Sequence, residues 1–378
     1  MGSAHLSCLK NGYIKNAIVV AACDINNKKC KSIAKKYPDI HIFNSAEELI
    51  KSGEVDAIII ATPHKYHSDI AISALENGIN VLVEKPVDIT VSKAKLLNDI
   101  AKKSGKVFGI MLNQRTNPLF VKAREIVKSG QLGKLKRSIW IVTNWYRTQA
   151  YYDSGDWRAT WSGEGGGVLL NQAPHNLDIW QWICGMPIKI QAKCEIAKYH
   201  NIEVEDEAVI NASFENGANG TFITSTGEYP GTNRLEISGT LGKIVLENNL
   251  LKWWKLSQDE EKVRMNSNES FTSIETEYFE IQPTEKESAH KGILQNFTNA
   301  VLSDEELIAP GYDGINELTI SNAAYLSAWN YCKEIEVPFD TEEFDTLLSS
   351  HIKNSNNHQN NTSSKSRDSY SSRWGVRW

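Results

Sequence analysis

The segment Ile79-Asn80-Val81-Leu82-Val83-Glu84-Lys85-Pro86 is an apolar run that ends in an acid, a base and a proline. A continuous run of aliphatic residues is typical of a strand that is buried on both faces of a parallel sheet. Such a strand delivers Lys85 to the carboxyl edge of the sheet, where open α/β folds bind their ligands. Pro86 restricts the backbone of Lys85 to an extended conformation, so the ammonium group is presented from a fixed position.

Two interpretations of Lys85 remain open from these residues. It is either a surface lysine at a strand end or a lysine that exchanges a proton with a substrate hydroxyl.

Strands and helices alternate at short spacing on both sides of this segment. Apolar runs cover residues 17–23, 55–61 and 106–112, and helical patterns cover residues 28–37, 68–77 and 91–104. Alternation of this kind is typical of a doubly wound parallel sheet that helices cover on both faces.

Asp24 closes the first apolar run, and Gly2 lies about 20 residues before it. In a dinucleotide-binding unit, this spacing separates the last glycine of the G-x-G-x-x-G turn from the acid that accepts a hydrogen bond from the adenosine ribose. The sequence therefore matches the second half of a dinucleotide-binding unit, without the strand and the first two glycines that precede it. We expect two strands to lack their neighbour, at a cost of about 1–3 kcal/mol for each buried unpaired backbone group. We also expect Met1 to be an internal methionine of a longer reading frame.

The pattern changes after about Gly130. Short alternating segments linked by turns follow, and Glu215-Asn216-Gly217 is a strong hairpin signal. Helical patterns interrupt them at residues 168–184, 291–302 and 314–333. We therefore assign residues 1–115 to a Rossmann-like domain and residues 116–345 to a second, α+β domain with a largely antiparallel sheet. Residues 354–378, which contain few apolar side chains, are expected to form a disordered tail.

The densest group of functional side chains begins with Trp157-Arg158-Ala159-Thr160-Trp161 and continues through three glycines to Asn171, His175 and Asp178. If residues 168–184 form one helix, the last three share a face. A histidine between an amide and a carboxylate is equipped for proton transfer near neutral pH, and the competing interpretation is a hydrogen-bonded core histidine. Trp157 and Trp161 are suited either to stacking on a sugar or to packing.

Composition limits the partners. A net charge of −5 with no basic run argues against nucleic acid, and no apolar segment approaches the roughly 20 residues that span a bilayer. The six cysteines lack the paired spacing of a zinc site, so no metal is expected. No signal peptide is visible, and we expect reduced thiols in the cytoplasm.

Three motifs resemble, in order and spacing, the glucose-fructose oxidoreductase, inositol 2-dehydrogenase and rhizopine-catabolism (Gfo/Idh/MocA) family. They are Glu84-Lys85-Pro86, Ala61-Thr62-Pro63 with His67 after it, and Gly165-Gly166-Gly167 followed by Asn171 and His175. The resemblance covers residue 1 to about residue 345. It implies an N-terminal Rossmann domain that holds NAD(H) or NADP(H), and a C-terminal domain whose open-faced sheet closes the sugar site and builds the interface of a homodimer or homotetramer.

The resemblance also implies roles for individual residues. Lys85 would hydrogen-bond the reacting hydroxyl, and His175 would take or return its proton. Asn171, where many members carry an aspartate, would orient the substrate but cannot itself accept the proton. Asp24 resembles the acid that favours NAD over NADP, because a carboxylate repels a 2′-phosphate. Substrate contacts are also expected from Arg158 and Trp161, and cofactor contacts from Gly2, Thr62, Pro63, His64, His67, Glu84, Lys85 and Gln114.

We expect an NAD-dependent oxidoreductase that moves a hydride between the nicotinamide and a secondary hydroxyl of a sugar, inositol or related polyol, in a cleft between the two domains. One alternative is an NAD-dependent glycosidase of the same family that oxidises its substrate transiently and releases no net NADH. Another is a truncated, non-catalytic protein with a dinucleotide fold.

Overall fold

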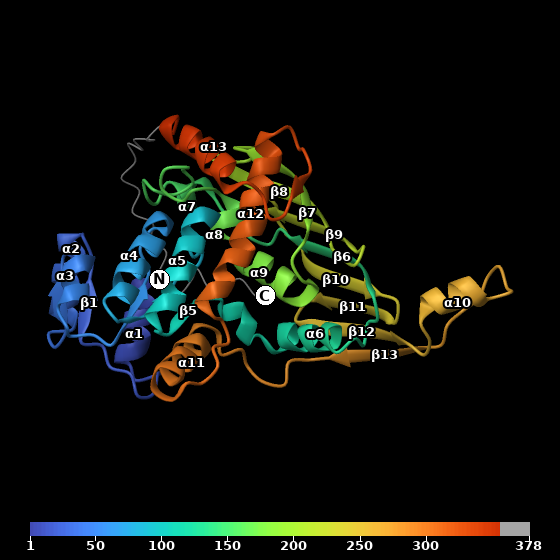
Figure 1. Cartoon of the computed structure of the whole chain (residues 1–378), viewed down its shortest axis with the longest axis horizontal. Coiled ribbons are helices and arrows are strands. Elements are labelled where there is room, and N and C mark those ends of the chain that lie inside the picture. Colours follow the sequence, from blue (N-terminus) through green and yellow to red (C-terminus); the bar gives the residue numbers. More distant parts are fainter. Residues whose placement is uncertain (356–378) are drawn as a thin grey trace. The chain divides into compact units, whose positions relative to one another are not determined.

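A computed structural model describes residues 1–355 as two compact units (Figure 1). The first unit comprises Met1–Thr116 and Ser288–Ile315, and the second comprises Asn117–Glu287 and the described residues from Asn316 onward. The tail expected at 354–378 lies outside the described residues from residue 356 on.

The first unit alternates short strands with helices. Its elements up to Thr116 are α1 (Gly2–Lys10), β1 (Ala21–Cys23), α2 (Asn27–Lys36), β2 (His41–Phe43), α3 (Ala46–Lys51), β3 (Ala57–Ile60), the 3₁₀ turn η1 (His64–Tyr66), α4 (His67–Glu76), β4 (Asn80–Val83), α5 (Val91–Ser104), β5 (Phe108–Ile110) and η2 (Asn113–Thr116). Side-chain oxygens of Asn26, Ser45 and Thr90 cap α2, α3 and α5. These residue types satisfy the unpaired N–H groups of a first helical turn, which is why the helices begin there.

The parallel strands form two sheets rather than one. β1 pairs with β2, whereas β3, β4 and β5 form a separate sheet with β4 in the centre. The side chains of Val81, Leu82 and Val83 are completely buried because β4 has a strand on each side. Ala21–Cys23 are only half-buried, and among the described residues no ladder joins β1 to β3. The predicted parallel α/β architecture is confirmed, and its sheet is interrupted between β1 and β3.

A late segment of the chain completes the first unit. It contains α11 (Ala289–Ser303) and η3 (Gly311–Asp313). The backbone N–H of Ile110, at the end of β5, donates to Ala309 O at 3.0 Å, and the buried guanidinium of Arg115 pairs with Asp313 at 2.6 Å. The sequence assignment of all residues 116–345 to one domain is therefore corrected, because local patterns do not reveal which sheet a distant helix joins.

The second unit is built on one large mixed sheet. Within the described residues the sheet has nine strands in the order β13-β12-β11-β10-β6-β9-β8-β7-β14. β6 and β9 are parallel, and the other neighbours are antiparallel. The strands are β6 (Leu135–Val142), β7 (Lys189–Ile196), β8 (Glu205–Ser213), β9 (Asn219–Ser225), β10 (Asn233–Gly239), β11 (Gly242–Glu247), β12 (Leu250–Leu256), β13 (Thr276–Ile281) and β14 (Ile335–Glu336). The predicted largely antiparallel sheet is confirmed.

Helices cover one face of this sheet and leave the other open (Figure 1). The helices of the unit are α6 (Pro118–Lys128), α7 (Gln149–Tyr152), α8 (Val168–Asn171), α9 (Pro174–Cys184), α10 (Glu260–Asn266), α12 (Gly314–Trp329) and α13 (Thr341–Lys353). Trp180 of α9 donates from Nε1 to Ser138 of β6 at 2.9 Å. Along β7, Ile190 and Ala192 are buried while Gln191 is exposed, as expected of a strand with one packed face. The β8–β9 hairpin turns at the predicted place, with Gly217 at φ +83°.

The single helix predicted over 168–184 is in fact two helices. α8 ends at Asn171, and Pro174 occupies the first turn of α9, where its missing N–H is not needed. The start of α8 lies so close to β8 that a Cβ on Gly167 would be 1.9 Å from the carbonyl oxygen of Glu205. Asn171 and His175 therefore lie on different helices, and only His175 and Asp178 share a helix face.

Candidate functional site

The carboxyl edge of the β3-β4-β5 sheet gathers most of the predicted cofactor residues. Thr62, Pro63 and His64 follow β3, whereas Glu84 and Lys85 follow β4. Gly2 begins α1 beside this edge, since a Cβ on it would lie 3.7 Å from the Cβ of Ala61. Gln114 is buried in η2, immediately beyond β5. Asp24 instead ends β1 in the smaller sheet.

The carboxylate of Asp24 is held by its own loop. Its Oδ1 accepts from the backbone N–H of Asn26 at 2.8 Å, and its Oδ2 accepts from Lys29 Nζ at 3.2 Å. The Asp24 side chain remains 27% exposed, so its oxygens are accessible to a further donor such as a ribose hydroxyl.

His67 ties the loops after β3 and β4 together. Its Nδ1 lies 2.7 Å from Pro86 O, and its Nε2 lies 2.8 Å from Thr62 O. The ring is 1% exposed, and both of its nitrogens face carbonyl groups of the protein. This arrangement favours a positioning role for His67 over the direct cofactor contact expected from the sequence.

Glu84 and two histidines form a buried cluster that sequence reasoning missed. His5 Nε2 of α1 donates to Glu84 Oε1 at 2.6 Å, and the His290 ring of α11 lies 5.8 Å from the His5 ring. Burial by itself raises the pKa of Glu84, but the hydrogen bond from His5 and the basic side chains of His5, His290 and Lys85 together outweigh it and hold the pKa at about 2. Burial lowers the pKa of His290 to about 4, which leaves its ring neutral near pH 7. A carboxylate is thus held ionised immediately before Lys85.

In the second unit, Asn171 and Arg158 belong to one polar cluster. The amide Nδ2 of Asn171 donates to Glu164 and, at 3.4 Å, to the hydroxyl of Tyr151. Glu164 is 1% exposed and also accepts from the backbone N–H of Ala159 at 2.7 Å. Arg158 donates to the Tyr151 hydroxyl at 2.9 Å and lies 3.8 Å from the Glu164 carboxylate. Neither Glu164 nor Tyr151 was selected from the sequence.

His175 lies in the first turn of α9, just beyond this cluster in the chain. Its side chain is largely buried, and so is that of Asp178, which accepts from Gln181 Nε2 at 2.9 Å. Gln172, in the break between α8 and α9, donates to the Tyr151 hydroxyl at 3.3 Å. The segment that connects Asn171 to His175 is therefore attached to the same hydroxyl as Asn171.

The two candidate tryptophans have different surroundings. Trp161 is 4% exposed, and its ring lies 5.5 Å from the Trp329 ring and 5.1 Å from the His351 ring. This placement makes Trp161 a core residue, contrary to the substrate contact expected for it. Trp157 is 37% exposed, and the guanidinium of Arg158 lies 4.6 Å from its ring.

Glu205 holds the start of α8. Its carboxylate accepts from the backbone N–H of Gly167 and of Leu169, each at 2.9 Å, and from the Tyr325 hydroxyl at 2.7 Å. Burial raises the pKa of Glu205 to about 7, and these donors limit the rise. The carboxyl group thereby fixes the backbone that leads to Asn171.

We expect Glu205→Gln to change how stability depends on pH. Because the folded-state pKa of Glu205, about 7, lies above the ordinary 4.5, its contribution to the unfolding free energy is full below pH 4.5 and is lost as the pH rises to 7. The variant should lack this loss, so its unfolding free energy should decline less steeply over that range. Urea unfolding at several pH values measures the slope, with the exposed Glu228→Gln as control. Equal slopes for Glu205→Gln and the wild type would contradict the expectation.

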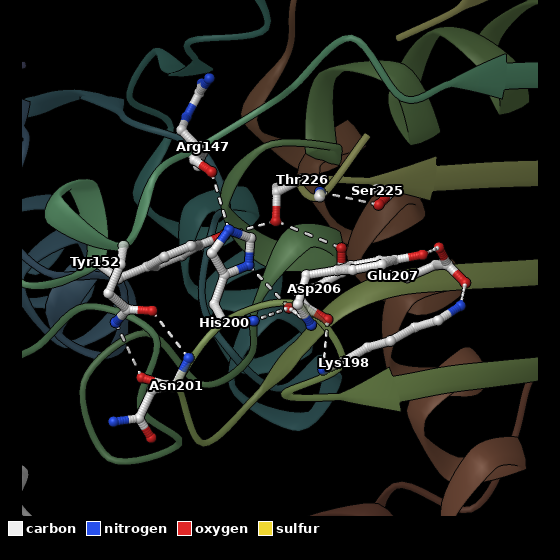
Figure 2. Close-up of polar contacts among 12 residues, drawn as sticks. Arg147, Tyr152, Lys198, His200, Asn201, Asp206, Glu207, Ser225 and Thr226 are labelled. Carbon is white, nitrogen blue, oxygen red and sulfur yellow. Dashed lines mark hydrogen bonds and ion pairs between the residues drawn. The ribbon is translucent and has the colours of Figure 1, made fainter. Parts of the chain in front are cut away.

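A second buried carboxylate, Asp206, organises the loop before β8 (Figure 2). It accepts from the backbone N–H groups of Lys198, Tyr199 and His200 and from His200 Nδ1 at 2.9 Å. The other ring nitrogen of His200 lies 2.9 Å from the backbone carbonyl oxygen of Arg147. The histidine thus connects the loop between β7 and β8 to the segment that follows β6.

The same network attaches the neighbouring helix α7. Figure 2 shows the Tyr152 hydroxyl next to Thr226, and Asn201 beside the segment that carries Tyr152. The hydroxyl oxygens of Tyr152 and Thr226 are 2.7 Å apart. Gln149 exchanges two hydrogen bonds with the backbone of Asn201. Because α7 also carries Tyr151, this network fixes the hydroxyl that Asn171, Gln172 and Arg158 contact.

The described residues contain no group of three or more metal-ligating side chains placed to hold a metal ion. In the same part of the chain, no helix combines the length and apolarity needed to cross a membrane.

Comparison with known families decides the assignment. A model of the oxidoreductase family with an NAD-binding Rossmann fold matches residues 1–112, and a model of the GFO/IDH/MocA C-terminal domain matches residues 120–245. The chain belongs to the Gfo/Idh/MocA oxidoreductase family.

Two curated relatives of this Gfo/Idh/MocA protein are inositol dehydrogenases. The scyllo-inositol 2-dehydrogenase (NAD(+)) of Bacillus subtilis is 26% identical over 212 residues, which cover 53% of this chain and 57% of that relative. The chain therefore spans little more than half the length of that relative. The myo-inositol 2-dehydrogenase of Thermotoga maritima is 24% identical over 256 residues, which cover 66% of this chain and 72% of the relative.

A solved structure shares the fold of this Gfo/Idh/MocA protein. The WlbA dehydrogenase from Bordetella pertussis, in complex with NADH and UDP-GlcNAcA, matches with a TM-score of 0.75 at 23% identity, over 90% of this chain and 95% of that one. At this identity the likeness shows the fold alone.

Proposed function

We propose that the protein is an NAD-dependent oxidoreductase that acts on a secondary hydroxyl of a sugar, inositol or related polyol. The observation that carries the proposal is the Glu84-Lys85-Pro86 turn at the carboxyl end of the buried strand β4, with its carboxylate held ionised by His5. Family membership and the inositol dehydrogenases among the relatives support the substrate class.

The residues of the first unit fit NAD at more than one point. Asp24 keeps an accessible carboxylate that suits ribose hydroxyls and disfavours the 2′-phosphate of NADP. The first turn of α1, from Gly2, presents a helix N-terminus of the kind that favours phosphate. Asn113, just beyond β5, has a buried side-chain oxygen with no partner among the described residues, an acceptor that suits a ligand amide. When bound, NAD supplies the acceptor for the hydride that leaves the alcohol carbon.

The protein's own residues would move the proton. Lys85 would hydrogen-bond the reacting oxygen, and His175 would take the hydroxyl proton, since an imidazole titrates in the range where such transfer is effective. Asn171 and Arg158 would orient the other hydroxyls of the substrate. Asn171 has no ionisable group and therefore contributes only hydrogen bonds.

Two further expectations belong to this proposal. The open face of the large sheet is suited to self-association as a homodimer or homotetramer, which light scattering would measure.

All six cysteines lie among the described residues and none forms a disulfide, in keeping with a cytoplasmic location.

A substrate panel tests the proposed function. The full chain is incubated with NAD⁺ and a set of inositols and sugars, and the absorbance of the reduced nicotinamide is followed. We expect net NADH with at least one polyol, and tighter binding of NADH than of NADPH by calorimetry because of Asp24. Cleavage of a glycoside without net NADH would favour the glycosidase alternative. Failure to bind NADH and to oxidise any polyol would refute the proposal.

A further inference from the structure

We propose that Glu164 is a positioning residue that locks the amide of Asn171, so that Asn171 presents its carbonyl oxygen, and not its NH₂ group, to a substrate hydroxyl. This inference rests on the proposed function and deepens it, because it specifies which hydrogen-bonding partner the substrate must offer at that position.

The contacts of Glu164 define the lock. Glu164 is 1% exposed, and its two oxygens receive different donors: Oε2 accepts from the backbone N–H of Ala159 at 2.7 Å, and Oε1 accepts from Asn171 Nδ2. The guanidinium of Arg158 lies 3.8 Å from Oε1. Every one of these neighbours is a donor, which suits an acceptor-only carboxylate. A buried acceptor of this kind is costly to leave unsatisfied, so it dictates which end of the Asn171 amide faces it.

A second acceptor reinforces the orientation. The Tyr151 hydroxyl accepts from Arg158 at 2.9 Å and lies 3.4 Å from Asn171 Nδ2. Because Nδ2 of the amide lies within hydrogen-bonding distance of both Glu164 and the Tyr151 hydroxyl, Oδ1 is the end of the amide that is turned away from these two acceptors. A flipped amide would put two oxygens in contact at Glu164, which is unfavourable in a buried site.

The lock has a consequence for recognition. An amide oxygen accepts a hydrogen bond from a hydroxyl but cannot receive one from an ether or a methoxy oxygen, because those groups carry no proton. We therefore expect the position next to Asn171 to require a free hydroxyl. A site built to bond a hydroxyl discriminates strongly against an analogue that lacks it, since its polar group is left unpaired.

A double-mutant cycle tests the lock. In Asn171→Asp two carboxylates would face each other, and in Glu164→Gln the single amide oxygen cannot serve both Ala159 and Asn171. The swap Glu164→Gln with Asn171→Asp restores complementarity, since the introduced glutamine would accept from Ala159 and donate to the introduced aspartate. We expect each single variant to lose at least about 10-fold in kcat/KM, mainly through a higher KM, and the swap to regain most of that loss.

Thermal unfolding of the same four proteins gives a readout that does not need activity. We expect both singles to unfold at lower temperature than the wild type and the swap to recover, whereas the exposed Glu215→Gln should change neither Tm nor kcat/KM. Additive losses in Tm, with no recovery in the swap, would overturn the lock. If the wild type oxidises no polyol, the proposed function fails, and the Tm cycle alone still decides whether Glu164 and Asn171 are coupled.

Discussion

Lys85→Met should lower the turnover of a polyol substrate by about 10²–10⁴-fold, the range that a single proton-transferring or hydrogen-bonding group contributes to catalysis. Methionine keeps the apolar stem of the side chain and removes only the ammonium group that would contact the reacting oxygen. The affinity for NADH should remain within a few-fold, because the backbone after β4 and the His5–Glu84 pair are unchanged. Steady-state kinetics and calorimetry with NADH measure the two effects separately.

Two further variants complete this experiment. Lys95→Met, on the exposed side of α5, changes the same functional group away from the sheet edge and should leave turnover unchanged. His175→Gln should lose turnover to a similar extent, because an amide cannot take the hydroxyl proton. If Lys85→Met loses NADH binding together with turnover, Lys85 holds the structure of the loop and our assignment of its role is wrong.

Breaking the buried pair between His5 and Glu84 should have the largest effect on stability. Glu84→Ala leaves the imidazole of His5 buried without its carboxylate partner. Removal of one member of a buried ion pair costs about 3–5 kcal/mol. Urea unfolding at pH 7 measures this loss for Glu84→Ala, His5→Ala and the double variant. We expect the double variant to be less destabilised than the sum of the two singles, because the second substitution no longer leaves an uncompensated group.

The pair also predicts the direction of the pH effect. The folded-state pKa of Glu84, about 2, lies below the ordinary value of 4.5, so its contribution to stability is full above pH 4.5 and is lost as the pH falls toward 2. The difference in unfolding free energy between the wild type and Glu84→Ala should therefore shrink in acid.

The exposed pair of His41 and Glu54, which are 2.9 Å apart, provides the matched control. Its loss should change stability by no more than about 1 kcal/mol, because solvent screens exposed ion pairs. If breaking the buried pair and breaking the exposed pair lowered the unfolding free energy equally, burial would not strengthen the contribution of the Glu84 carboxylate to stability.

These two predictions concern adjacent residues and are coupled. The backbone N–H of Glu84 donates to Ile60 O at 2.9 Å, so β3 and β4 stay paired up to the residue before Lys85. Glu84→Ala keeps this backbone bond but removes a carboxylate whose charge interacts with Lys85, so it should lower turnover as well as stability. Lys85→Met should not show the converse loss of stability.

Much of the architecture was predictable because it depends on local pattern. The apolar run before Glu84 defined a buried strand, and the Glu215-Asn216-Gly217 turn defined a hairpin, since both signals lie within a few neighbouring residues. Strands β12 and β13 were missed. In β13 almost every residue is exposed, so an alternation of burial, which is the signal for a strand, is absent.

The candidate site was predictable only in part. Lys85, His175 and Asn171 stood out because they end strands or lie near glycines, whereas their supporting groups carried no local signal. His5 is 79 residues from Glu84 along the chain. Glu164 lies directly before the three glycines and carries no pattern of its own, although its carboxylate accepts from Asn171 Nδ2.

The sequence by itself determined the alternation of strands and helices, the carboxyl-edge position of Lys85 and the family motifs, because hydrophobic period and turn chemistry act over a few residues. Only the tertiary structure decided that α11 completes the first unit, that His5 pairs with Glu84, and that Glu164 accepts from the amide of Asn171. A buried polar group must find a partner wherever the topology brings a donor, and that partner is set by three-dimensional proximity rather than by its distance along the chain.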